Sequence, residues 1–263
     1  MCGDSEETYV QLLGPFSVRF GDAVVTPRAS KQRQVVALLA LRARQVVTTA
    51  TLVDELWAGR PPRTFGATLQ TYVFQVRREL ATALPAKRDI KEILSTRHSG
   101  YLLECWTDID EVERLAADGR SAAEAGNPRS ASDLLGRALA LWRGPALADV
   151  RQGPVLEIEA AVLAETRLSL AARRVEADLA MHRYADVIGE LTSLTAEHPT
   201  NENFCGLLMR ALYHSGYTAR ALEAFRQLRA ALNRELGVEP GPPLQELHRS
   251  ILSGDLAADA DTG

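Results

Sequence analysis

The sequence predicts a mostly α-helical protein with a small amount of β-structure, built in two parts. Three observations support this fold class. The first 26 residues alternate apolar and polar side chains in short runs separated by Gly and Pro, which is typical of antiparallel strands. From Ser30 the apolar residues recur at helical spacing instead. After residue 108 the strand patterns stop, and nearly all of the chain is rich in Ala, Leu, Arg and Glu.

Two or three short strands open the chain, namely TYVQLLG, FSVRF and AVVT. A first helix follows with Ser30 as its candidate N-cap. A second, TATLVDELW, has Thr48 or Thr49 as its cap. The next nine residues, AGRPPRTFG, contain two Gly and two Pro and therefore form a loop.

A third helix is expected from about Phe65 to Leu84. Its apolar residues recur at spacings of four, three, four and four and form one buried stripe: Leu69, Val73, Val76, Leu80 and Leu84. The opposite side of the helix carries hydrogen-bonding side chains and one phenylalanine: Thr68, Thr71, Phe74, Gln75 and Arg78, with Gln70 and Arg77 on one flank. A phenylalanine that faces outward among polar residues requires an explanation.

A hairpin follows the third helix. The segment EILSTRHSGYLLE alternates and turns at His98-Ser99-Gly100, with Arg97 and His98 at the tip and with Ile93 and Tyr101 in the core strands. Three helices followed by a hairpin, with strands before them, describe a winged helix-turn-helix.

The second half carries a repeat. Leu179 and Leu212, and likewise Tyr184 and Tyr217, lie 33 residues apart, which is typical of tetratricopeptide-like helical hairpins. We therefore expect a winged helix-turn-helix domain with preceding strands over residues 1–107 and a tetratricopeptide-like domain over 108–252. The segment 253–263 has no apolar pattern and is expected to be a disordered tail.

Composition narrows the class of protein. The 263 residues are 46% hydrophobic and 24% charged, as in ordinary globular chains. No apolar run approaches the roughly 20 residues that cross a bilayer, and the acidic start lacks the features of a signal peptide, so we expect a cytoplasmic protein with no membrane partner. Cys2, Cys105 and Cys205 are far apart and predict buried, inert thiols rather than a disulfide or zinc site.

Enzymatic motifs are lacking. The sequence has no G-x-x-x-x-G-K, G-x-G-x-x-G, G-x-S-x-G or H-E-x-x-H, and its five His are dispersed. We therefore expect no catalytic residues, no metal site and no cofactor.

Charge is divided unevenly along the chain. Residues 28–103 hold 13 basic and five acidic side chains, a net charge of +8, whereas residues 109–263 hold 16 Arg and 23 acidic side chains, a net charge of −7. One interpretation is that the basic part faces phosphate. The other is ordinary variation of surface charge.

The outward side of the third helix suits DNA. Gln70 and Gln75 can read base edges, and Phe74 can contact a thymine methyl group. Three arginines can neutralise phosphates: Arg77, Arg78 and Arg97. The alternative is a solvated helix surface with Phe74 packed on a neighbouring loop.

Several sequence segments within residues 9–252 resemble the Streptomyces antibiotic regulatory protein (SARP) family. They are LVDELW, LQTYVFQVRREL and LGVEPGPPLQELH, together with TRHSGYLLE. Such proteins pair an OmpR-type winged helix with a bacterial transcriptional activator domain and activate biosynthetic gene clusters.

The resemblance implies roles for individual residues. The recognition helix supplies DNA contacts, and the wing adds two: Thr68, Gln70, Thr71, Phe74, Gln75, Arg77 and Arg78, with Arg97 and His98. The loop from Trp57 to Gly66 resembles the transactivation loop that contacts RNA polymerase, through Trp57, Arg60, Arg63 and Thr64.

We therefore expect a sequence-specific transcriptional activator, not an enzyme, of a secondary-metabolite (antibiotic) gene cluster. Its partners would be double-stranded promoter DNA, bound at direct repeats as a homodimer or in tandem, and the sigma and alpha subunits of RNA polymerase. The alternative is a helical-repeat adaptor whose basic N-terminal domain binds RNA or a protein.

Overall fold

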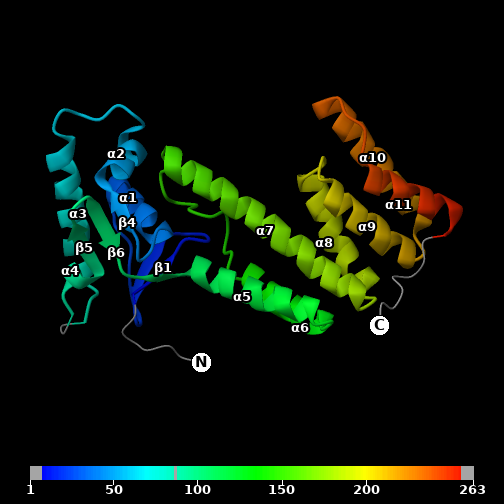
Figure 1. The fold of residues 1–263 in the computed structure, drawn as a ribbon, viewed down its shortest axis with the longest axis horizontal. Helices are drawn as coiled ribbons and strands as arrows, with labels where there is room; N and C mark the ends of the chain where they lie inside the picture. Colours follow the sequence, from blue (N-terminus) through cyan, green and yellow to red (C-terminus); the bar gives the residue numbers. More distant parts are fainter. Residues whose placement is uncertain (1–7, 86–87, 256–263) are drawn as a thin grey trace. The chain divides into compact units, whose positions relative to one another are not determined.

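A computed structural model describes residues 8–85 and 88–255 (Figure 1). Its strands are β1 (Thr8–Gln11), β2 (Ser17–Phe20), β3 (Ala23–Val25), β4 (Val46–Thr48), β5 (Leu94–Arg97), β6 (Gly100–Leu103) and β7 (Trp106–Thr107). Its helices are α1 (Ser30–Leu41), α2 (Thr49–Trp57), α3 (Phe65–Ala81), α4 (Ile90–Ile93), α5 (Asp108–Glu124), α6 (Pro128–Leu139), α7 (Pro154–Ala180), α8 (Tyr184–Glu197), α9 (Glu202–His214), α10 (Thr218–Leu236) and α11 (Pro242–Ser253). The mostly helical fold class is confirmed, with its N-terminal strands, winged-helix region and C-terminal helical domain.

Packing divides the chain into two compact units. The first contains the residues up to Ala116 together with Arg137–Leu168, and the second contains Ala117–Gly136 together with the residues from Ser169 onward. Helices α5, α6 and α7 each contribute residues to both units. The domain boundary expected at residue 107 stays a prediction, because the two units are defined by contacts between residues and do not mark where a domain begins or ends.

The first unit contains two small sheets. In one, β1 pairs antiparallel with β2 and parallel with β7, and β3 extends the edge beyond β2. In the other, β6 lies between β4 and β5 and is antiparallel to both. Strands β4 and β6 approach so closely that a Cβ at Gly100 would lie 2.0 Å from the carbonyl oxygen of Val47. Position 100 therefore accepts no side chain, which fixes the turn end of the β5–β6 hairpin, where Gly100 pairs with Arg97.

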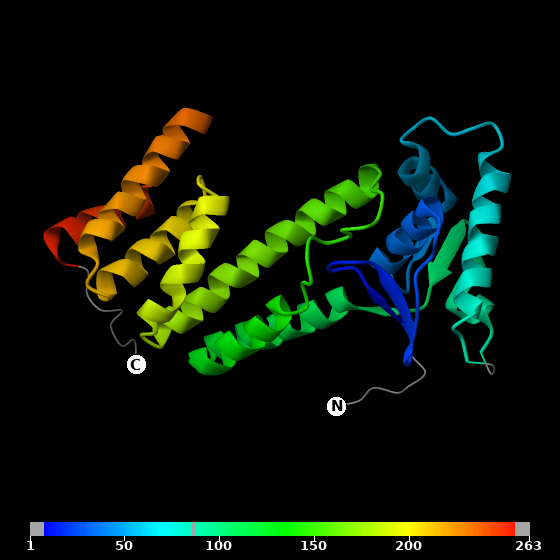
Figure 2. The ribbon, with the colours of Figure 1, turned by 180° about the vertical axis from the view of Figure 1, so that it is seen from behind.

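The hydrophobic core of this unit joins the helices to both sheets. Helix α1 lies between α3 and the sheet that contains β1 (Figures 1 and 2), and its residues from Val35 to Ala40 are all buried. Helix α2 begins after Thr48, whose side-chain oxygen accepts a hydrogen bond from the Thr51 N–H, so the expected cap is confirmed. The predicted stripe of α3 is buried at Leu69, Val73, Val76 and Leu80.

Three details differ from the sequence prediction. Ser30 is the first residue of α1 rather than its N-cap, which is Ala29, and no side chain caps this helix. Helix α3 ends at Ala81 rather than Leu84, because the next three residues form hydrogen bonds to carbonyls three positions earlier and leave α-helical geometry. Ile93 is buried as expected, but it ends the short helix α4 instead of lying in a strand.

A buried carboxylate joins the start of α7 to α2. Glu55 is 1% exposed, and its carboxylate oxygens accept hydrogen bonds from the backbone N–H groups of Gly153 (2.6 Å), Val155 (2.9 Å) and Leu156 (3.0 Å). The Gln34 side-chain amide donates a fourth at 2.7 Å. The carboxylate thus acts as a cap supplied from another helix, in favourable alignment with the α7 dipole.

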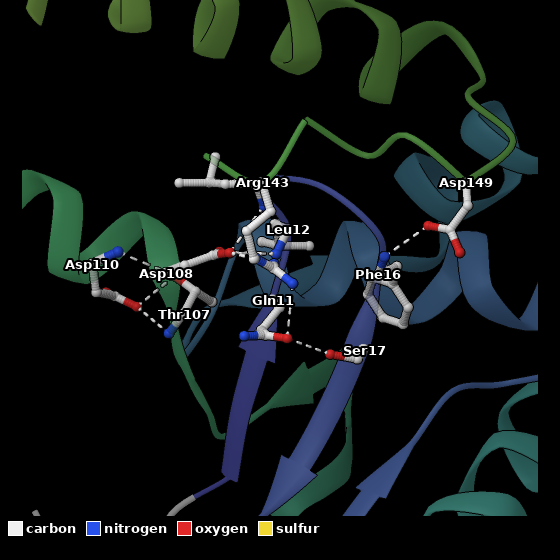
Figure 3. A network of polar contacts seen from close by, with 10 residues as sticks. Gln11, Leu12, Phe16, Ser17, Thr107, Asp108, Asp110, Arg143 and Asp149 are labelled. Atoms are coloured by element: carbon white, nitrogen blue, oxygen red, sulfur yellow. Dashed lines mark hydrogen bonds and ion pairs between the residues drawn. The ribbon is translucent and has the colours of Figure 1, made fainter. Parts of the chain in front are cut away.

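A second polar network holds the turn after β1 (Figure 3). Asp108 is 2% exposed and accepts hydrogen bonds from the backbone N–H groups of Leu12 and Leu13, and Arg143 lies beside it at 3.3 Å. Asp149 accepts from the backbone N–H of Phe16 at 2.7 Å. Side chains that follow β7 therefore bind the backbone of the turn between β1 and β2.

The second unit contains the repeated helices. Helix α9 packs against both α8 and α10, as expected for tetratricopeptide-like hairpins. The repeat is visible in the turns: His182 and Gly216, two residues before Tyr184 and one before Tyr217, both adopt positive φ, at 58° and 83°. The buried carboxylate of Asp178 accepts from Ser132 and pairs with two arginines, which ties α7 to α6 within this unit.

The thiols match the sequence analysis where the structure describes them. Cys105 and Cys205 are free and buried, and burial raises the pKa of each thiol to about 12. Cys2 and most of the expected tail lie outside the described residues. Within residues 8–85 and 88–255, no helix combines the length and apolar character needed to span a bilayer, and no cluster of His, Cys, Asp and Glu could hold a metal ion.

We predict that Asp110→Asn destabilises the fold near neutral pH but not at acidic pH. Burial tends to raise the pKa of Asp110, but hydrogen bonds from Arg44 and Thr107 outweigh it and hold the pKa below its ordinary value. A lowered carboxyl pKa stabilises the fold above the unfolded pKa of about 3.9, and this stability is lost as pH falls through the folded value. Because the pair is partly exposed, we expect a deficit of about 1 kcal/mol or less near pH 7 in urea unfolding.

The deficit should shrink as pH falls below about 4. Glu113→Gln, which removes the same charge at an exposed position of α5, is the control. A deficit that is independent of pH would show that Asp110 contributes through packing alone.

Candidate nucleic-acid interface

The outward face of α3 is formed by the residues that do not contact the core. Since the stripe from Leu69 to Leu80 is buried, the opposite side of the helix faces solvent. Four of the predicted residues are exposed: Gln70, Thr71, Phe74 and Arg78. Three are half-buried: Thr68, Gln75 and Arg77.

Phe74 is 64% exposed. The alternative in which Phe74 packs on a neighbouring loop is therefore not observed. An exposed aromatic ring beside exposed Thr71 and Arg78 is an apolar contact point within a hydrogen-bonding surface.

The two threonines are bound to their own helix. The Thr68 hydroxyl donates to the carbonyl of Thr64 at 3.0 Å, and the Thr71 hydroxyl donates to that of Ala67 at 2.9 Å. Their hydroxyl hydrogens are thus used, while an oxygen lone pair and a methyl group on each stay available to a ligand.

Gln75 is held by a residue that the sequence analysis did not select. The side-chain Nε2 of Gln32 on α1 donates to Oε1 of Gln75 at 2.7 Å. No sequence signal identifies this partner, because the two residues lie 43 positions apart.

Arg77 is engaged with the hairpin. Its guanidinium donates two hydrogen bonds to the carbonyl of Leu94, at 2.9 and 2.7 Å, and a third to the hydroxyl of Thr96 at 2.9 Å. This geometry favours a role for Arg77 in positioning β5, and its expected DNA contact stays a prediction.

The hairpin tip lies at Arg97 and His98, which are both exposed. The carbonyl of Ser99 accepts a hydrogen bond from the backbone N–H of Thr49 at 2.9 Å, so the tip is tied to the start of α2. Together with Arg77, this contact fixes the hairpin relative to α3.

The loop between α2 and α3 begins with a left-handed residue, Ala58, at φ 48°. Trp57 is half-buried and stacks on Tyr72 of α3, with ring centroids 6.4 Å apart. The other predicted loop residues are exposed: Arg60, Arg63 and Thr64. Trp57 therefore anchors the loop, and the exposed residues form its surface.

Two family models match the chain. Residues 25–103 match the transcriptional regulatory protein C-terminal domain, and residues 107–252 match the bacterial transcriptional activator domain. The regulatory protein DnrI of Streptomyces peucetius is 45% identical over 255 residues, which cover 95% of this chain and 94% of DnrI. The chain belongs to the SARP family of transcriptional regulators.

Other relatives agree with this assignment. The transcriptional regulator RedD of Streptomyces coelicolor is 37% identical over 94% of this chain and 71% of RedD. Among solved structures, Mycobacterium tuberculosis EmbR in complex with a low-affinity phosphopeptide superposes with a TM-score of 0.89 at 32% identity. That match covers 95% of this chain and 66% of EmbR.

The charges of this SARP chain are divided within the first unit. Three arginines of the basic segment form ion pairs with acids that follow β7: Arg33 with Asp149, Arg42 with Glu159 and Arg44 with Asp110. Within residues 8–85 and 88–255, no ion pair engages the arginines of α3 or of the hairpin tip. Positive charge is therefore retained on the face that carries Phe74.

We predict that Arg77→Met lowers the free energy of unfolding by about 1 to 3 kcal/mol, because the methionine stem fills the same space without the charge-assisted hydrogen bonds to β5. Arg78→Met, on the exposed face of the next position, is the matched control and should change stability by less than about 0.5 kcal/mol. Urea unfolding of both variants measures the difference. Equal stability of the two variants would contradict the positioning role of Arg77.

Proposed function

We propose that this transcriptional regulator binds double-stranded promoter DNA with α3 in the major groove and activates a secondary-metabolite gene cluster. The relatives named above are transcriptional regulators, and the proposal assigns the chain no catalytic step. Binding to promoter DNA would place the protein in the bacterial cytoplasm.

The exposure of Phe74 is the observation that carries the proposal. A phenylalanine that is 64% exposed buries little apolar surface in its own domain and contributes little to its stability. Contact with a thymine methyl group in the major groove would bury it. The neighbouring amides of Gln70 and Gln75 suit base edges, and the hydroxyls of Thr68 and Thr71 can accept hydrogen bonds there.

The arginines of this surface can bind the phosphate backbone of DNA. Arg78 on α3 and Arg97 with His98 at the hairpin tip are exposed, and they are proposed to meet phosphates on either side of the groove. Arg77 is assigned to the same surface, with its hydrogen bonds to β5 aligning the hairpin.

The loop from Trp57 to Gly66 is proposed to contact the sigma or alpha subunit of RNA polymerase. Its exposed Arg60, Arg63 and Thr64 support this assignment, with Trp57 as the anchor. Two chains, arranged in tandem or as a homodimer, are proposed to occupy direct repeats near the promoter.

We predict that Phe74→Ala reduces sequence-specific binding without unfolding the protein. A cognate duplex is first selected from a randomised pool, and affinity for it and for a scrambled duplex is then titrated at several salt concentrations. Because Phe74 lies outside the core, the melting temperature should hold, while binding to the cognate duplex weakens by about 1 to 3 kcal/mol. Affinity for the scrambled duplex, which depends on phosphate contacts, should barely change.

Two results would contradict the proposal. A near-flat dependence of log affinity on log salt would exclude a phosphate-bound complex. Tighter binding of single-stranded RNA than of any duplex would favour the adaptor alternative. Leu69→Ala, at a buried position on the same helix, is the control for a folding defect: it should lower the melting temperature and weaken binding to both duplexes together.

A further inference from the structure

Gln32 lies in the first turn of α1, where the helix packs against α3. It is 5% exposed, and its Nε2 donates to Oε1 of Gln75 at 2.7 Å. Gln75 is half-buried between Phe74 and the buried stripe of α3. The side-chain amide of Gln75, on the proposed DNA surface, is thus held in place by a side chain of α1.

This arrangement carries an energetic cost. Among the described residues, the Oε1 atom of Gln32 is buried without a hydrogen-bond partner. A buried polar atom without a partner destabilises a fold, and an apolar side chain of the same length would avoid that cost. A role other than stability therefore accounts for a glutamine at this position.

We infer that Gln32 is a positioning residue that sets the base preference of Gln75 by holding its side-chain oxygen. The inference rests on the proposed binding of α3 to DNA. With Oε1 turned toward Gln32, the Nε2 group of Gln75 is the end of the amide left for a ligand, and it carries two N–H donors.

The hydrogen-bonding groups on the base edges then decide which base Gln75 prefers. An N–H donor pairs with a base edge that accepts hydrogen bonds, and in the major groove guanine presents two adjacent acceptors, N7 and O6. The two-bond pairing of glutamine with adenine also requires Oε1 to accept from the adenine amino group. Because the hydrogen bond from Gln32 holds Oε1 toward α1 and leaves Nε2 facing the ligand, Gln75 should favour guanine over adenine at the base pair that it faces.

The test compares the bases that each full-length protein selects from a pool of randomised duplexes. The variants are Gln75→Ala, Gln32→Met, Gln32→Leu and the double variant Gln32→Met/Gln75→Ala. Gln75→Ala should reduce the guanine preference at one base pair by about ten-fold. Gln32→Met and Gln32→Leu should reduce it at the same base pair and admit adenine, since the freed amide can then turn.

Two comparisons separate positioning from packing. In the Gln75→Ala background, Gln32→Met should cause no further loss, because both residues act through one contact. Gln70→Ala, on the same face, should change a different base pair, and Gln32→Met should act independently of it. Melting curves should show all Gln32 variants at least as stable as the wild type, since they remove a buried oxygen without a partner.

Three outcomes would overturn the inference. The Gln32 variants could keep the wild-type base preference while Gln75→Ala loses it. They could instead weaken every position of the site alike, as a general folding defect would. A wild-type chain that enriches no sequence overturns the proposed function, and this inference with it.

Discussion

One buried carboxylate, that of Glu55, connects the parts of the first unit. It accepts hydrogen bonds from the backbone N–H groups of Gly153, Val155 and Leu156 at the start of α7, where a helix offers no acceptors of its own. The approach is so close that a Cβ at Gly153 would lie 2.0 Å from the Glu55 carbonyl oxygen. The start of α7 and the helix α2 are therefore fixed together, and α2 leads directly into the loop and α3.

This connection decides which face of the winged helix is available. The segment that contains Asp149 and Glu159 covers part of α1, where it pairs with Arg33 and Arg42. Acids from the bacterial transcriptional activator domain thus neutralise arginines away from α3. The arginines of α3 and of the hairpin tip form no such ion pairs among the described residues. Within the first unit, positive charge is therefore neutralised on α1 and retained on the outward face of α3 and the hairpin tip.

The sequence predicts those features of the fold and site that depend on residue type and on the spacing of apolar residues along one element. The stripe beginning at Leu69 follows from helical period, the cap at Thr48 from residue type, and the exposure of Phe74 from its place opposite that stripe. Contacts between distant residues leave no such pattern. Glu55 meets α7 about 100 positions away, and Arg77 appears on a helical wheel as a flank residue although β5 engages it. Strands β4 and β7 span three and two residues, too few to show alternation.

Residue-resolved hydrogen exchange of Glu55→Gln tests the central role of this carboxylate most directly. The glutamine NH2 group replaces one of the two acceptor oxygens, so either the Gly153 amide or the amides of Val155 and Leu156 lose their acceptor and should exchange faster, and opening of the first unit should require about 3 kcal/mol less. Amides of α8 to α10 should be unaffected, and the exposed neighbour Asp54→Asn should change neither. Unchanged exchange at those three amides in Glu55→Gln would show that α7 is held by packing alone and would contradict the account.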